Sequence, residues 1–336
     1  MQAVIPAAGQ GTRLYPQTHT KPKAMVRVAG RPVVGHILSS LAETRIDDVV
    51  LVVGGPMQDQ IVEYTQTAFE DRFTFQYVEQ RNAEGLGHSV LQAAEAVGEE
   101  PMLIALGDML FENGYKMFLE EHDDLHDPDA TIGVKRVDEP RHYGVVELSD
   151  DNRITGLVEK PEDPPSNYAI SGVYIIENSR KLFRSLRQLV ERDLRGAGNE
   201  YQLTDGLQRM IDDGAVFGAF EVEDWYDCGR PETLLEANRV LLRHIDSDLA
   251  EEPDGSVVIP PVDFGSEVTV SGSVVGPNVS LDDGATVVDS IVSETIVGQK
   301  ARIEGVNLEE SIVGDNAHVL GEANELNIGD NSTISF

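Results

Sequence analysis

Cysteine, lysine and long apolar runs are all scarce in this sequence, and each shortage excludes a class of protein. Cys228 is the one cysteine among 336 residues, so neither an internal disulfide framework nor a zinc site with several cysteines can form. No apolar run approaches the ~20 residues that a membrane-spanning helix needs. Residues 1–5 have the pattern of a β-strand and not of a secretion signal. We therefore expect a cytoplasmic protein without a membrane partner.

Positive charge is scarce as well. The chain has 26 lysines and arginines against 59 acidic residues, which gives a net charge of -33 and a pI near 4.4. The excess of negative charge repels the phosphates of nucleic acids, so we expect no nucleic-acid partner. The acidic residues are dispersed along the chain, and there are only seven lysines. Both features are typical of proteins from salt-loving organisms, where concentrated salt screens self-repulsion. We expect a halophilic protein of haloarchaeal origin.

The amino-terminal part of the chain alternates short apolar runs with amphipathic segments, which predicts a sheet covered on both faces by helices. After residue 131 strands predominate, and helical segments follow them. We predict an α/β fold over residues 1–245, a Rossmann-like domain with a mixed, mostly parallel sheet between helices. The expected strands of its first part are 2–8, 49–53, 73–78 and 102–106, and the expected helices of that part are 32–41, 58–69 and 90–97.

The carboxy-terminal part has a different pattern. Residues 246–255 are predicted to be an acidic linker, and helical periodicity is lost over residues 256–336. A motif recurs there: an apolar residue, glycine, two polar residues and a small residue. Its copies start at residues 275, 297, 313 and 328, close to the repeat of a three-sided β-solenoid. The pattern resembles the hexapeptide-repeat left-handed β-helix, and a β-sandwich or loose roll is the alternative.

A glycine-rich loop directly follows the first predicted strand. Residues 7–14 read Ala-Ala-Gly-Gln-Gly-Thr-Arg-Leu, and glycines let backbone N–H groups approach phosphate oxygens closely. The guanidinium of Arg13 adds donors matched to phosphate geometry, and Lys21 and Lys23 flank a proline nearby. The loop predicts a phosphate site, against the alternative of a structural turn with solvated lysines. A dinucleotide-binding fingerprint fits less well, because Leu14 stands at its third glycine position.

With three further motifs, this loop resembles the sugar-1-phosphate nucleotidylyltransferases, specifically their glucose-1-phosphate thymidylyl- and uridylyltransferase branch. The three motifs are Gly107-Asp108, Glu159-Lys160-Pro161 and Trp225-Tyr226-Asp227-Cys228-Gly229. A carboxy-terminal β-helix accompanies a subset of this family. The resemblance implies transfer of a nucleotidyl group from dTTP or UTP to a sugar 1-phosphate, most readily glucose 1-phosphate, with release of pyrophosphate.

The same resemblance implies which residues form the site. Asp108 and Asp227 would bind Mg²⁺, a hard ion that takes carboxylate and phosphate oxygens. Arg13, Lys23 and Lys160 would be catalytic and neutralise phosphate charge. The Gln80 amide carries both a donor and an acceptor and can match a pyrimidine edge. The implied nucleotide contacts are Ala8, Gly9, Gly11, Thr12, Gln80 and Gly85, and the implied sugar contacts are Tyr143, Gly144, Glu159, Ile170, Gly172 and Trp225.

Two other functions stay open at this point, and three departures from the family pattern leave the preferred nucleoside and sugar undecided. The β-helix could also acetylate, although His318 is its single histidine. The chain could instead be a non-catalytic regulatory subunit that binds nucleotide sugars, although its charged residues are intact. Ala24 and Met109 stand where the family usually has glutamine and asparagine. Residues 197–200 occupy a stretch where the family often has a phosphate-contacting arginine beside the glycine, and here Arg195 sits two residues earlier. We also expect the β-helix to support a homo-oligomer.

Overall fold

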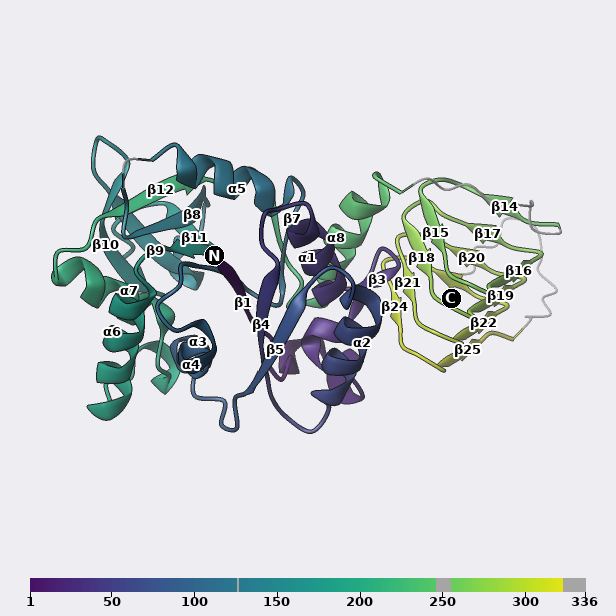
Figure 1. Ribbon diagram of the computed structural model, residues 1–336. Coiled ribbons are helices and arrows are strands. Elements are labelled where there is room, and N and C mark those ends of the chain that lie inside the picture. Colours follow the sequence, from purple (N-terminus) through teal and green to yellow (C-terminus); the bar gives the residue numbers. More distant parts are fainter. Residues whose placement is uncertain (126, 246–254, 323–336) are drawn as a thin grey trace. The chain divides into compact units, whose positions relative to one another are not determined.

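The computed structural model describes residues 1–125, 127–245 and 255–322 (Figure 1). Within it the chain forms two compact units, Met1–Ala237 and Asn238–Phe336, and the division falls inside helix α8 (Pro231–Leu242). Of the predicted acidic linker, residues 246–254 lie outside the described residues, and so does the last repeat motif, at 328–332. The two units are described separately below.

A nine-stranded mixed sheet forms the centre of the first unit. Its order is β5-β4-β1-β6-β11-β8-β12-β10-β9. The four strands from the amino-terminal part are parallel to one another, while β11 pairs antiparallel with both β6 and β8. The predicted mixed sheet of a Rossmann-like domain is confirmed. The strands are β1 (Gln2–Pro6), β4 (Asp48–Val53), β5 (Thr74–Glu79), β6 (Met102–Ala105), β8 (Ala130–Arg136), β9 (Gly144–Leu148), β10 (Arg153–Glu159), β11 (Tyr168–Ile176) and β12 (Phe217–Glu221).

Helices cover the sheet, which explains why its central strands are apolar throughout (Figure 1). Helices α3, α6 and α7 pack together, and α1 packs against α2 and α5. Each presents apolar residues at helical spacing; in α5 these are Tyr115, Phe118 and Leu119, all buried. The helices are α1 (Val33–Ala42), α2 (Asp59–Phe69), α3 (Leu86–Gln92), α4 (Ala94–Val97), α5 (Gly114–Asp123), α6 (Ser179–Glu191), α7 (Leu203–Asp212) and α8.

Short elements connect these layers and carry much of the candidate site. A two-stranded antiparallel ribbon pairs β7 with β13, with Asp227 opposite Met109. The ribbon therefore brings the segment after β6 next to a segment more than a hundred residues later in the chain. The short elements are β2 (Arg27–Val28), β3 (Arg31–Pro32), β7 (Met109–Phe111), β13 (Trp225–Asp227) and the 3₁₀ helices η1 (Thr12–Leu14), η2 (Gln17–His19), η3 (Lys23–Met25), η4 (Pro140–His142) and η5 (Ala197–Asn199).

The second unit contains three parallel four-stranded sheets, the arrangement of a β-helix. Their orders are β14-β17-β20-β23, β15-β18-β21-β24 and β16-β19-β22-β25, so consecutive coils stack on one another. Buried apolar side chains from these strands form the core of this unit, among them Val275, Val287 and Val297. The strands are β14 (Val257–Val258), β15 (Val262–Phe264), β16 (Thr269–Ser271), β17 (Val274–Val275), β18 (Val279–Leu281), β19 (Thr286–Val288), β20 (Ile291–Val292), β21 (Ile296–Val297), β22 (Arg302–Glu304), β23 (Asn307–Leu308), β24 (Ile312–Val313) and β25 (His318–Leu320).

The register of these coils corrects one detail of the predicted repeat. Val297 pairs with Val313, as the motif spacing requires, but the partner of Val297 in the preceding coil is Leu281. Val275, which was taken to start the first copy, belongs instead to β17 on another sheet. The irregular first spacing arose because the motif also occurs at a different corner of the coil.

No helix among the described residues is long and apolar enough to cross a membrane.

Candidate active site

The glycine loop after β1 is held by contacts with the two short helices that follow it. Gly11 has a φ of +64°, and a Cβ atom there would lie 2.9 Å from side-chain atoms of both Lys23 and Thr18. The Thr18 hydroxyl donates a hydrogen bond to the Gly11 carbonyl at 2.7 Å. Glycine is thus required at residue 11 by conformation and by space. At Gly9, by contrast, a Cβ would meet nothing within 4 Å, so this part of the loop is open to a ligand.

Two aspartates from distant parts of the chain converge on Lys23. Its ammonium forms an ion pair with Asp108 Oδ2 and lies 3.9 Å from Asp227 Oδ1. The β7–β13 ribbon sets this geometry, since Asp108 precedes β7 and Asp227 ends β13. The Cys228 amide also donates to the Asp108 carbonyl at 2.9 Å. A cation between these carboxylates is therefore shared by both.

This pair fits the Mg²⁺ that the resemblance implies. The side chains of Asp108 and Asp227 are about one third exposed, and both already face one cation. Mg²⁺ is commonly bound through one or two carboxylates plus substrate phosphates and waters. Among the described residues, no three or more His, Cys, Asp or Glu side chains are grouped so that they could hold a metal ion.

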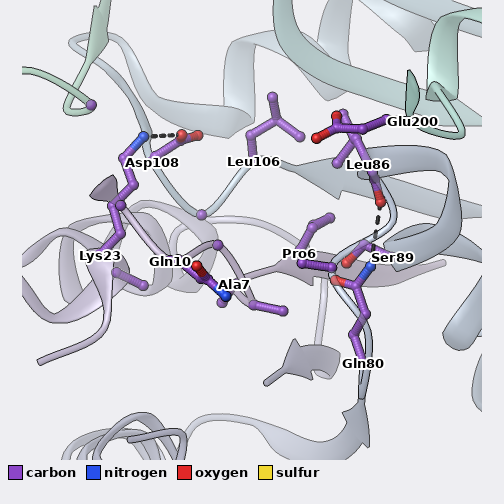
Figure 2. Close-up of a pocket in the computed structure, with 18 of the residues that line it drawn as sticks. Pro6, Ala7, Gln10, Lys23, Gln80, Leu86, Ser89, Leu106, Asp108 and Glu200 are labelled. Carbon is purple, nitrogen blue, oxygen red and sulfur yellow. Dashed lines mark hydrogen bonds and ion pairs between the residues drawn. The ribbon is translucent and has the colours of Figure 1, made fainter. Parts of the chain in front are cut away.

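A cavity of about 550 Å³ lies beside the glycine loop and Asp108 (Figure 2). It is lined by eleven residues that the sequence analysis assigned to the site, drawn from segments across the first unit. Six others assigned with them are not in its wall. The eleven are Ala8, Gly9, Gly11, Thr12, Arg13, Lys23, Gln80, Gly85, Asp108, Glu159 and Lys160; the six are Tyr143, Gly144, Ile170, Gly172, Trp225 and Asp227.

One end of the cavity is formed by the loop from Gln80 to α3. Gln80 is 6% exposed, and its Nε2 donates to the Gly85 carbonyl at 3.3 Å. The loop is connected to the segment before α7, because the Tyr201 amide donates to the Glu84 carbonyl and the Gly87 amide donates to the Tyr201 carbonyl, both at 2.8 Å. A Cβ on Gly85 would lie 2.6 Å from that Tyr201 carbonyl. Glycine at residue 85 thus permits the close approach of two backbones.

Glu159 and Lys160 form another part of the wall. The Thr204 hydroxyl donates to Glu159 Oε2 at 2.6 Å, and Lys160 Nζ lies 3.4 Å from Glu159 Oε1. Lys160 has a φ of +45°, and its amide donates to the Tyr143 carbonyl at 3.0 Å. Burial, together with the charge of Glu159, raises the pKa of Asp205. Negative charge is therefore concentrated here, with the Lys160 ammonium beside it.

The six assigned residues outside the wall lie behind it or next to it. Gly144 is adjacent to Glu159, since a Cβ there would be 2.9 Å from Glu159 Oε2. The rings of Tyr143 and Trp225 are in contact, with centroids 5.3 Å apart. Gly172 has a φ of +94°, and its carbonyl accepts from the Leu106 amide at 3.3 Å. These residues support the wall, and Asp227 reaches the site through Lys23.

The cavity also includes residues for which no individual role was expected. Among them are Gln10 in the glycine loop, Leu86 and Ser89 in α3, and Glu200 and Gln202 in the segment before α7. A signal existed for Glu200, because it follows a glycine-containing stretch that departs from the family pattern. No signal existed for Ser89, which directly precedes the predicted helix 90–97 and belongs to no distinctive motif. Its Oγ is buried and has no hydrogen-bond partner among the described residues.

The contacts of Arg195 and the burial of Cys228 indicate that these two residues stabilise the structure and take no direct part in the site. The Arg195 guanidinium donates to Glu84, Tyr201 and Asp193, and it is absent from the cavity wall. The hydrogen bonds to Asp193 and Glu84 raise the pKa of Arg195. Cys228 is fully buried, and burial raises the pKa of its thiol. A buried thiol with a raised pKa is a poor nucleophile, so Cys228 is a packing residue.

These features define a class of protein: an α/β domain in which a glycine loop, a lysine and a carboxylate pair surround a cavity at the carboxyl ends of parallel strands, where such folds bind nucleotides. Residues 2–244 match the family described as "Nucleotidyl transferase". The chain therefore belongs to this family, and the resemblance inferred from the motifs is confirmed.

Curated relatives include both single-activity and bifunctional proteins. A glucose-1-phosphate thymidylyltransferase of Streptomyces antibioticus is 32% identical over 93% of this chain and 87% of its own length. The bifunctional protein GlmU of Methanocaldococcus jannaschii is 35% identical over 77% of this chain, which spans only 59% of that relative. The low-salt glycan biosynthesis nucleotidyltransferase Agl11 of Haloferax volcanii is 32% identical over 72% of this chain and 66% of its own.

Solved structures show the same fold. A UDP-glucose pyrophosphorylase complexed with UDP-glucose is 26% identical, with a TM-score of 0.62 over 73% of this chain and 99% of that one. A UTP-bound UGPase from Acinetobacter baumannii is also 26% identical, with a TM-score of 0.58 over 71% of this chain and 92% of that one. The similarity to solved structures thus covers roughly the extent of the first unit.

Proposed function

We propose that the protein transfers a nucleotidyl group from a pyrimidine nucleoside triphosphate, dTTP or UTP, to a sugar 1-phosphate, with glucose 1-phosphate the first candidate. The observation that supports this most is the set of cations and carboxylates at one cavity. Arg13, Lys23, Asp108 and Lys160 line its wall, and Asp227 reaches the Lys23 ammonium. In a chain with 26 basic and 59 acidic residues, the three cations Arg13, Lys23 and Lys160 at one cavity support an anionic ligand.

The reaction needs no covalent enzyme intermediate. An oxygen of the sugar phosphate attacks the α-phosphorus of the triphosphate in line, and pyrophosphate leaves from the opposite side. Lys160 would neutralise the incoming phosphate, while Arg13 and Lys23 would stabilise the charge on the departing pyrophosphate. Asp108 and Asp227 would hold Mg²⁺, which when bound neutralises phosphate charge and orients the α-phosphate. Positioning and charge neutralisation therefore supply the catalysis.

The remaining assignments concern the substrate ends of the cavity and the cellular setting. Gln80 and Gly85 would contact the base, with Ala8, Gly9, Gly11 and Thr12 along the phosphates. The sugar would lie at Glu159 and Lys160, supported by Tyr143, Gly144, Ile170, Gly172 and Trp225. UTP and dTTP share the same hydrogen-bonding edge, so contacts with that edge do not distinguish the two nucleotides.

We further propose a cytoplasmic homo-oligomer that depends on the β-helix.

The test is an assay of pyrophosphate release by purified protein in molar KCl with Mg²⁺, glucose 1-phosphate and each nucleoside triphosphate in turn. We expect release with UTP or dTTP, and kcat/KM for the two identifies the physiological donor. No release with any combination of nucleoside triphosphate and sugar phosphate would contradict the proposal and leave a nucleotide-sugar-binding subunit. The GlmU relative motivates one more measurement, because release of CoA from acetyl-CoA would show a second activity.

A further inference from the structure

The side chain of Gln80 is held in one orientation by the groups around it. Its Nε2 donates to the Gly85 carbonyl at 3.3 Å and lies 3.1 Å from Nδ1 of His88 (Figure 2 shows the contact with the loop). A carbonyl oxygen can only accept, so the nitrogen of the carboxamide must face Gly85. Gln80 lines the cavity, and the hydrogen bonds that the structure shows for its side chain use Nε2. Its Oε1 is therefore the group left for a ligand.

The surroundings of His88 favour the tautomer that accepts from Gln80. The His88 side chain is 14% exposed, and its Nε2 lies 3.6 Å from Glu84 Oε2. Because a carboxylate can only accept, it favours a proton on Nε2 and leaves the lone pair on Nδ1. Glu84 is held in turn by Arg195 at 3.0 Å. The Gln92 carboxamide also lies 3.1 Å from His88 Nε2, and its Nε2 donates to the His88 carbonyl at 3.2 Å. A proton on His88 Nε2 therefore requires that this carboxamide turn its oxygen toward the ring and give up the bond to the carbonyl. The Glu84 carboxylate is the group that favours this arrangement, and Gln92 itself lies outside the cavity wall.

We propose that His88 is a positioning residue that fixes the Gln80 carboxamide with its oxygen toward the base, and so selects uracil and thymine against cytosine. The inference rests on the proposed function, in which the base of the nucleotide lies against Gln80. Uracil and thymine carry a hydrogen on N3, which Oε1 accepts. Cytosine has a lone pair on N3, which would face the lone pairs of Oε1. A freely rotating glutamine could turn to satisfy either base; one held by His88 and Gly85 cannot.

The experiment compares three substitutions of His88. Asparagine places its Oδ1 near the position of Nδ1, so His88→Asn keeps an acceptor for Gln80. Glutamine extends to the position of Nε2, and leucine carries no polar group, so His88→Gln and His88→Leu both remove that acceptor. We expect His88→Leu and His88→Gln to lower the ratio of kcat/KM for UTP to that for CTP by on the order of 10- to 100-fold, mainly through KM. His88→Asn should stay near the wild-type ratio.

Gln92→Leu is the matched control, because Gln92 contacts the other ring nitrogen and lies outside the cavity wall. It should leave the ratio unchanged. An unchanged ratio in His88→Leu would overturn the proposal. Equal losses with UTP, dTTP and CTP, together with a lowered melting temperature, would also overturn it and show a purely structural role.

Calorimetric titration with UTP and with CTP, without sugar phosphate, separates this inference from the proposed function. If the wild-type protein binds UTP more tightly than CTP but releases no pyrophosphate, the proposed nucleotidyl transfer is refuted and the selection against cytosine is supported. Wild-type protein that binds both nucleotides equally refutes the selection, whatever reaction it catalyses.

Discussion

At the scale of single residues, the site depends on charges that are paired with one another before any substrate is present. The Lys23 ammonium lies between Asp108 and Asp227, and the Lys23 side chain is 11% exposed. Gly229 leaves room for this arrangement, since a Cβ there would lie 2.6 Å from both the Lys23 ammonium and Asp227 Oδ1. Each of these charges compensates the others, so the removal of one changes the electrostatics of the site more than its packing.

We predict that Asp227→Asn lowers kcat by on the order of 10²- to 10³-fold while the fold is retained, since the substitution keeps the shape and removes one negative charge. Asp224→Asn is the control: Asp224 is a nearby aspartate whose partner is Lys135, at 3.6 Å, outside the cavity wall. Pyrophosphate release and circular dichroism would be measured on both. Global unfolding of Asp227→Asn would instead identify a structural residue.

Sequence patterns and structure agree best where function depends on neighbours in the chain. The glycine loop and Lys23 lie within fifteen residues of each other, and they line one cavity as their motif predicts. Gln202 and Ser89 were not predicted, because they enter the cavity wall only through the packing of the segment before α7 and of α3. No local pattern marks such residues.

At the scale of elements, the loop from Gln80 to α3 and the segment before α7 act as one backbone unit. They are connected by reciprocal hydrogen bonds through Tyr201, and Arg195 adds a side-chain connection to Glu84. Helix α3 begins at Leu86, four residues before the predicted start at residue 90. Gly85 and Gly87 flank the first residue of the helix. Because glycine is a poor helix former and usually marks a loop, the sequence pattern did not indicate a helix start there.

Gly85→Ala tests this unit. A methyl group there would lie 2.6 Å from the Tyr201 carbonyl, and φ is +109°. We expect a loss of about 1–3 kcal/mol in the free energy of unfolding and a raised KM for the nucleotide. Gly214→Ala has the same kind of backbone strain, with a φ of +86°, but nothing within 4 Å, so it should cost only about 1 kcal/mol. Equal KM values for the two variants would contradict the role of the loop.

Helix α1 carries a titratable group that the site does not use. His36 Nε2 bonds to the Val28 carbonyl at 2.7 Å, and burial, aided by Arg31 and Arg27, lowers the pKa of His36 to about 4. The unfolded residue takes up its proton near its ordinary pKa of 6.5. The stability that this difference contributes is therefore fully present above pH 6.5 and is lost as the pH falls toward 4.

We predict that His36→Gln, which keeps a donor near Nε2, reduces the loss of stability between pH 7 and pH 4.5. The difference from wild type should be up to about 3 kcal/mol. Urea unfolding at the two pH values in molar KCl measures it. The acidic residues titrate alike in both proteins, so parallel losses in wild type and variant would show that His36 does not contribute.

Helix α5 shows a pattern that sequence analysis could have used. No helix was expected over residues 114–123, yet Tyr115, Phe118, Leu119 and His122 are buried at helical spacing. Acidic residues on the opposite face, and a glycine at its first position, obscured this spacing. The pattern was present in the chain, but its apolar face was too short to distinguish a helix from a loop with buried aromatics.

At the scale of the whole molecule, net charge is the property with the widest consequence. A chain of 59 acidic and 26 basic residues repels itself unless salt screens the charges, and the Debye length falls from ~10 Å at 0.1 M to ~3 Å at 1 M ionic strength. The structure shows ion pairs between acidic and basic side chains, but the basic residues are too few to pair with most of the acidic ones. Stability should therefore depend on ionic strength.

We predict that the melting temperature rises by on the order of 10 °C between dilute and molar KCl, which corresponds to a few kcal/mol of screened repulsion. Differential scanning calorimetry measures the shift. Sucrose at equal osmolality serves as the control, because it is excluded from the protein surface without screening charge. A melting curve that KCl leaves unchanged would contradict the halophilic hypothesis.

By itself the sequence determined the family, the alternation of strands and helices in the first unit and the solenoid character of the second, because each depends on residues close together in the chain. Only the tertiary structure decided which distant residues meet. Asp108 and Asp227 share one cation because β7 pairs with β13 in a single register, and the coils of the β-helix align Leu281 with Val297 and not with the motif at Val275. Register between distant strands depends on packing and backbone hydrogen bonds summed over the fold, and no local pattern contains that sum.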